Sequence, residues 1–81
     1  MDARTAQRLY ASMELHGQIM VYARRYFSVR EDREDAKQEA WAAIVMNGCR
    51  ACTVREAEGI ARRCIRNKYM RVWRARQHIQ N

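Results

Sequence analysis

The sequence contains no proline, only three glycines and few β-branched residues. Because turn formers and strand formers are scarce, the composition favours helices and gives no hairpin signal. No apolar run approaches the ~18 residues that a membrane span needs, and the amino terminus lacks the layout of a signal peptide. Eighty-one residues leave room for one domain with a small core and no enclosed substrate cavity. We therefore expect an all-α, compact three-helix domain, residues 1–81, that is cytoplasmic, does not enter a membrane and is not an enzyme.

The first helix is expected to run from about Ala3 to Phe27. Its apolar residues recur at spacings of four and seven, with three further residues flanking the same seam, as in a helix that packs along its length. The seam consists of Leu9, Met13, Met20 and Phe27, flanked by His16, Ile19 and Ala23. We interpret His16 as a hydrogen-bonded, partly buried side chain, because no second metal-binding residue type stands three or four positions away.

Two further helices follow from capping signals. Ser28 with Glu31 fits a capping box, with Asp32 a rival cap, so a second helix begins near residues 29–33 and continues to about Asn47, where Gly48 stops it. Its apolar side is Ala36, Ala40, Ala43, Ile44 and Asn47, whereas Trp41, Val45 and Met46 could serve either as core or as a dimer seam. Thr53 with Glu56 is a second capping box, which predicts a last helix from near Val54.

The second and third helices carry opposite charges. Asp35, Gln38 and Glu39 form one acceptor-rich face of the second helix. The stretch from Ile60 to Arg76 carries seven Arg or Lys, and no acid follows Glu58 in a chain of net charge +7. The predicted buried stripe beneath these charges is Ala57, Ala61, Cys64, Ile65 and Val72. Tyr69 and Trp73 add two rings that can stack on unpaired bases. The alternatives are a solvated basic helix, and acids that favour their own helix dipole and pair with Arg33 and Lys37.

The cysteines give no metal prediction. Cys49 and Cys52 form a Cys-x-x-Cys pair, but a structural zinc needs four ligands and only Cys64, His16 and His78 remain. An odd number of cysteines without a secretory signal indicates free thiols. We therefore expect no metal and no cofactor.

The segments YARRYFSVREDREDAKQEAW and IARRCIRNKYMRVWR resemble region 2 of bacterial sigma factors of the extracytoplasmic-function (ECF) type, over roughly Val21 to Arg76. In that family an acidic Asp-Ala-x-Gln-Glu helix docks on the clamp helices of the RNA polymerase β′ subunit. The resemblance implies that Asp35, Gln38 and Glu39 make this contact. The family's last helix grips the melted non-template strand of the minus-ten promoter element, which falls by position on Arg62, Arg63, Arg66, Asn67 and Arg71.

The predicted nucleic-acid-binding set combines these positions with the two rings and one more arginine: Arg62, Arg63, Arg66, Asn67, Tyr69, Arg71, Trp73 and Arg74. Thr53 and Glu56 stand where the family usually has an aromatic residue and a tryptophan, and the preceding loop is several residues shorter than the family's. These departures leave two alternatives open. One is a small phage or mobile-element protein that inhibits a host nucleic-acid complex or captures an anti-sigma factor. The other is a plain basic nucleic-acid binder without a polymerase contact.

Overall fold

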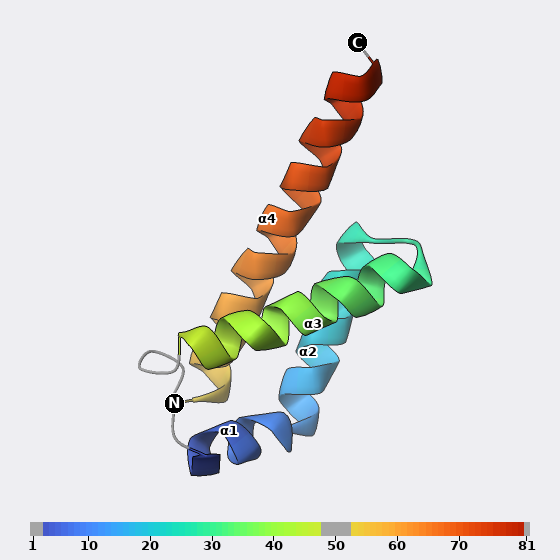
Figure 1. Cartoon of the computed structure of the whole chain (residues 1–81). Coiled ribbons are helices and arrows are strands. Elements are labelled where there is room, and N and C mark those ends of the chain that lie inside the picture. The colour runs from blue at the N-terminus through green and yellow to red at the C-terminus, as the bar shows by residue number, and fades with distance from the viewer. Residues whose placement is uncertain (1–2, 48–52, 81) are drawn as a thin grey trace.

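The computed structural model describes residues 3–47 and 53–80, and every element in these ranges is a helix (Figure 1). The helices are α1 (Ala3–Tyr10), α2 (Met13–Tyr26), α3 (Arg30–Met46) and α4 (Val54–Gln80). Helices α2, α3 and the first part of α4 pack together, α1 lies at one end, and the C-terminal part of α4 projects away from the body. The all-α prediction is confirmed. None of the described helices combines the length and the apolar character that a membrane crossing requires.

The predicted first helix is wrong in one respect, because it is two helices separated at Ala11 and Ser12. Ser12 adopts an extended backbone conformation, and its hydroxyl accepts a hydrogen bond from the Leu15 N–H at 3.2 Å. A side-chain cap of this kind satisfies a free N–H group at a helix start and stabilises a new helix there. The chain therefore contains four helices in its described residues instead of the three predicted.

Helix α3 begins at Arg30, within the predicted range of residues 29–33, but its predicted cap is wrong. Val29 occupies the cap position and no side chain caps the helix, so neither Ser28 nor Asp32 acts as predicted. Instead, Arg33 donates from Nε to the Phe27 carbonyl at 2.8 Å and from Nη2 to the Ser28 carbonyl at 2.9 Å. These bonds from within α3 fix the connection to α2.

The other helix boundaries match the prediction. Helix α3 ends at Met46 with Asn47 as its C-cap, while the predicted stop at Gly48 lies outside the described residues. At the start of α4, Thr53 Oγ1 accepts from the Glu56 N–H at 3.2 Å and donates to the Glu56 carboxylate at 3.0 Å. Thr53 therefore caps α4 as predicted, although the Glu56 carboxylate accepts from the Thr53 hydroxyl instead of the backbone N–H of a full capping box.

The core consists of one apolar strip from each helix. Its buried members are Leu9, Leu15, Ile19, Ala23, Phe27, Ala36, Ala40, Ile44, Ala57, Ala61 and Ile65. Met13 was predicted in this core, but its side chain is 83% exposed. Leu15 takes its place, because Leu15, Ile19, Ala23 and Phe27 recur every fourth residue and so share the side of α2 that is buried. Of the remaining predicted core residues, Met20, Ala43, Cys64 and Val72 are half-buried and Asn47 is exposed.

Candidate nucleic-acid interface

Helix α4 has one buried side and one basic side. Ala57, Ala61 and Ile65 recur every fourth residue and are fully buried against the other helices. Because the helix turns about 100° per residue, the opposite side is left to solvent. That side carries seven of the eight residues predicted for nucleic-acid binding, all of them exposed: Arg62, Arg63, Arg66, Asn67, Arg71, Trp73 and Arg74.

These side chains form a continuous surface, which we call the basic face of α4. Arg62, Arg66 and Trp73 fall within about 40° of one another around the helix axis, so they form one line of side chains. Arg63 and Arg74 lie beside it, within about 120° of Arg62. The distance from Arg62 to Arg74 along the axis is about 18 Å at 1.5 Å per residue. Along the axis of B-form DNA each strand carries one phosphate per about 3.4 Å, so this length corresponds to about five phosphates of axial rise.

Most of the basic face has no acidic partner. Among the described residues, no carboxylate lies within ion-pair distance of Arg62, Arg63, Arg66 or Arg74. Arg71 is the exception, since its Nη2 lies 3.9 Å from Glu39 Oε1. Four arginines within 13 residues therefore keep their charge uncompensated by the described part of the domain, which is the electrostatic condition for binding a polyanion.

The two predicted stacking rings differ in their surroundings. The Tyr69 ring packs beside the core, with its centroid 5.1 Å from that of Tyr26 and 6.1 Å from that of Phe27. Trp73 is 44% exposed and is not among the residues packed on the described core. Trp73 can therefore offer its ring to a base, whereas Tyr69 already contributes to packing.

The predicted acidic face is partly paired within the domain. Lys68 Nζ lies 2.7 Å from Asp35 Oδ2 and 2.7 Å from Glu39 Oε2. Lys68 was not predicted as a site residue, yet its side chain is only 15% exposed and it joins α4 to α3. The Asp35 contact is a hydrogen bond, and the buried Glu39 Oε2 has Lys68 as its ion-pair partner at the same distance. The pairing raises the pKa of Lys68, first through Asp35 and then through Glu39.

The three predicted polymerase-binding residues are therefore not equivalent. Glu39 is 40% exposed and faces both Lys68 and Arg71. Asp35 keeps 62% of its side chain exposed despite the ion pair. Gln38 is exposed, and it lines a shallow depression of about 420 Å³ on α3 together with three acids and one arginine: Glu31, Glu34, Asp35 and Arg30. The acidic surface open to a partner is this depression, centred nearer the start of α3 than predicted.

The sequence indicates that Lys68 needs an acidic partner only through its position on α4. It stands three residues after Ile65 and four after Cys64, so it belongs to the side of α4 that packs on the domain. A lysine on a packed side needs an acidic partner. The sequence does not show which acids of α3 reach it, because that depends on the crossing of the two helices.

The remaining titratable residues form no described metal site. No group of three or more His, Cys, Asp or Glu with metal-binding geometry occurs among the described residues. Cys49 and Cys52 lie outside them, so that part of the prediction stays open. His16 Nε2 is 2.5 Å from the Tyr10 carbonyl and its ring is half-buried beside Trp41, as predicted for a hydrogen-bonded side chain. Burial raises the pKa of the Cys64 thiol, and the nearby Glu39 carboxylate adds to the effect.

Comparisons of the chain with protein-family models, with curated proteins and with solved structures found no match.

Proposed function

We propose that this domain binds single-stranded nucleic acid through the basic face of α4, as a sigma region 2-like module that acts in transcription initiation or its regulation. The observation that carries the proposal is the set of four exposed arginines without an acidic partner among the described residues. Each can contact a phosphate, and phosphate contacts supply most of the affinity in sequence-independent binding.

The exposed Trp73 ring favours a single strand over a duplex as the ligand. Its exposed ring lies in line with Arg62 and Arg66, so a strand that follows the arginines passes over it. Stacking of a base on an aromatic ring contributes about 1–3 kcal/mol and requires a base that is not already paired and stacked. The bases of an intact duplex do not meet this requirement.

The test is a fluorescence anisotropy titration with labelled oligonucleotides. We expect a single strand to bind more tightly than a duplex of the same sequence. Trp73→Ala should lower the affinity for the single strand by about 5- to 160-fold and leave the affinity for the duplex nearly unchanged. Tyr26→Phe is the matched control, because it alters a half-buried aromatic residue away from the basic face. Equal binding of both nucleic acids, or no effect of Trp73→Ala, would refute the single-strand assignment.

The proposed polymerase contact uses the part of the acidic face that remains open. Gln38 is the best position to test it, because it is exposed and takes no part in the Lys68 ion pairs. A partner that docks on an acidic face is expected to present a basic surface to it. Gln38→Lys places a positive charge opposite that surface of the β′ clamp helices, and like charges across an interface lower affinity. We expect the domain to retain a purified clamp-helix fragment in a pull-down and Gln38→Lys to abolish this. The matched control is Gln7→Lys on α1, which should bind normally.

A second candidate is a plain nucleic-acid binder without a polymerase contact. The pairing of Asp35 and Glu39 with Lys68 favours it, because acids that stabilise the fold need no external partner to explain them. The two candidates differ in the pull-down. Binding of single-stranded DNA together with failure to retain the clamp fragment would support the plain binder. Retention of the clamp fragment without DNA binding would support interference with the polymerase.

A further inference from the structure

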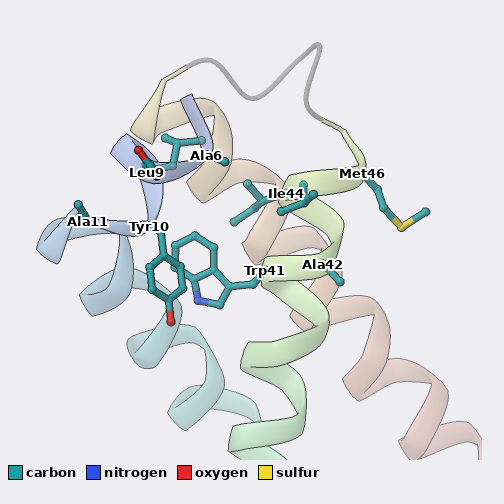
Figure 2. Close-up of a pocket in the computed structure, with 10 residues that line it drawn as sticks. Ala6, Leu9, Tyr10, Ala11, Trp41, Ala42, Ile44 and Met46 are labelled. Atoms are coloured by element: carbon teal, nitrogen blue, oxygen red, sulfur yellow. The ribbon is translucent and has the colours of Figure 1, made fainter. Parts of the chain in front are cut away.

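A polar pocket lies beside the basic face, near the start of α4. It has a volume of about 260 Å³ and is lined by Tyr22 of α2 and by Arg55, Glu58, Gly59 and Arg62 of α4. Its chemistry differs from that of the hollow between α1 and α3, where most of the lining is apolar or aromatic (Figure 2). The pocket is slightly smaller than the ~300–1,000 Å³ that drug-sized ligands occupy, which suits a ligand group of one or two fused rings.

The pocket continues the line of arginines on α4. Arg55 and Arg62 are seven residues apart, so they fall within about 20° of each other around the helix and about 10 Å apart along its axis. Both are exposed, and neither has a carboxylate partner among the described residues. A strand that follows the basic face past Arg62 therefore reaches the pocket and then Arg55.

An acidic residue lies between these two cations. Glu58 stands three residues after Arg55 and four before Arg62, spacings at which ion pairs form on helices, yet in the described structure it pairs with neither. Instead, its Oε1 accepts a hydrogen bond from the Tyr22 hydroxyl at 3.1 Å. Tyr22 packs against the core, so this bond holds the carboxylate in place. The other carboxylate oxygen has no hydrogen-bond partner in the described part of the chain and can accept one from a ligand.

The pocket is open because residue 59 has no side chain. Gly59 lies inside α4, where glycine is less stable than alanine. Apart from its chain neighbours and the adjoining helix backbone, no described atom lies within 4 Å of the position that a Cβ would take, so packing does not require a glycine. A large side chain at this position would cover the space between Arg55 and Arg62. The glycine therefore keeps this space accessible to a ligand.

The donors and acceptors of the pocket match the Watson–Crick edge of guanine. This edge presents two adjacent donors, N1–H and the N2 amino group, with the O6 acceptor beside them. A carboxylate can accept from both donors while an arginine donates to O6. Thymine, cytosine and adenine each place an acceptor next to the donor, and that acceptor would face a carboxylate oxygen. A phosphate in the same place would be repelled by Glu58.

We propose that this pocket binds one guanine base of the single strand on the basic face, with Glu58 accepting from N1–H and N2–H and Arg55 donating to O6. The inference rests on the proposed single-strand binding and adds a base preference to it. The Watson–Crick edge of guanine is accessible when the base is unpaired, and it is occupied in a duplex. Arg62 remains available for a neighbouring phosphate.

The experiment compares oligothymidylates of about ten nucleotides, which cover the ~27 Å from Arg55 to Trp73, with different central bases. The central base is thymine, guanine, adenine, cytosine or hypoxanthine, which lacks the N2 amino group of guanine. By fluorescence anisotropy we expect guanine to raise the affinity at least about tenfold over thymine, and hypoxanthine to recover only part of this gain. Equal affinity for all central bases would overturn the guanine pocket and leave the proposed function intact. No binding of any oligonucleotide would overturn both.

Glu58→Gln should change the two kinds of binding in opposite directions. Loss of the negative charge beside the arginines should raise the affinity for plain oligothymidylate, whereas the preference for guanine should fall to within about twofold. Glu14→Gln on α2 is the matched control, because Glu14 is an exposed glutamate outside the pocket, and it should keep the preference. A full preference for guanine in Glu58→Gln would contradict the proposal.

Gly59→Leu should close the pocket without removing any of its polar groups. Because leucine is the better helix former, the thermal unfolding midpoint should not fall, while the preference for guanine should be lost and oligothymidylate should bind within about twofold of wild type. Gly17→Leu is the matched control, since Gly17 is an exposed glycine inside α2 with the same open space around it. It should keep the preference. Guanine preference that survives Gly59→Leu would show that the base is recognised elsewhere.

Discussion

Replacing Arg66 by glutamine removes one of the four arginines of the basic face that lack a carboxylate partner among the described residues, while keeping a long polar side chain. For a single strand, the logarithm of the binding constant falls with the logarithm of salt concentration by about 0.7 for each phosphate contacted. If Arg62, Arg63, Arg66 and Arg74 each contact one phosphate, the slope is about −2.8 for wild type and about −2.1 for Arg66→Gln. Between 50 and 200 mM salt these slopes correspond to losses of about 50-fold and about 20-fold in affinity.

The assay is a salt titration of single-stranded DNA binding, followed by fluorescence anisotropy. The matched control is Arg4→Gln on α1, which removes the same charge from an exposed helical position away from the basic face. We expect the control to retain the wild-type slope, because it removes no phosphate contact. An unchanged slope in Arg66→Gln, or an equal change in both variants, would show that net charge and not the basic face determines binding.

Three further predictions concern stability and are measured by chemical denaturation. Leu15→Ala should cost about 2–5 kcal/mol of unfolding free energy because Leu15 is fully buried, whereas exposed Met13→Ala should cost less than about 0.5 kcal/mol; equal costs would contradict the described core. Ser12→Ala should cost about 1 kcal/mol through its lost cap and Ser28→Ala almost nothing, and the reverse order would contradict the helix boundaries. Lys68→Met should cost about 1–3 kcal/mol at neutral pH, because it leaves a buried carboxylate oxygen without its cation. Since folding raises the pKa of Lys68, this difference should persist up to the usual lysine range and disappear only as the pH rises above it; no difference at neutral pH would contradict the ion pairs.

The helix content and the start of α4 could be predicted because their causes are local. The Thr53 cap involves residues three positions apart, and the four-residue spacing of Ala57, Ala61 and Ile65 marks the buried side directly. The exposure of the arginines follows from the same periodicity. No knowledge of the neighbouring helices is needed for any of these.

The division of the first helix could also have been recognised. Leu15, Ile19, Ala23 and Phe27 recur every fourth residue, and Ser12 stands three positions before Leu15, as a helix cap does. The predicted seam through Met13 and Met20 also has helical spacing, so spacing alone does not distinguish the two sets of residues. A continuous helix is the simpler interpretation of a segment with no proline or glycine at the break, but the Ser12 cap divides it into two helices.

The pairing of Lys68 with Asp35 and Glu39 could not be predicted from periodicity. These residues are about 30 positions apart in sequence, and their approach depends on the angle at which α3 crosses α4. The packing of Tyr69 against Tyr26 has the same origin. Both contacts use residues of the predicted binding surfaces for packing. The surface that remains exposed consists of Trp73 and the four arginines that have no carboxylate partner in the described part of the chain.

The most direct test of the central claim is a nuclear magnetic resonance titration of the isotope-labelled chain with a short single-stranded oligonucleotide. We expect the largest shift changes at Arg62, Arg66 and Trp73, with the amides of α1 nearly unaffected. Absence of shifts along α4, or shifts confined to α1 and the end of α3, would contradict the assignment of nucleic-acid binding to this helix.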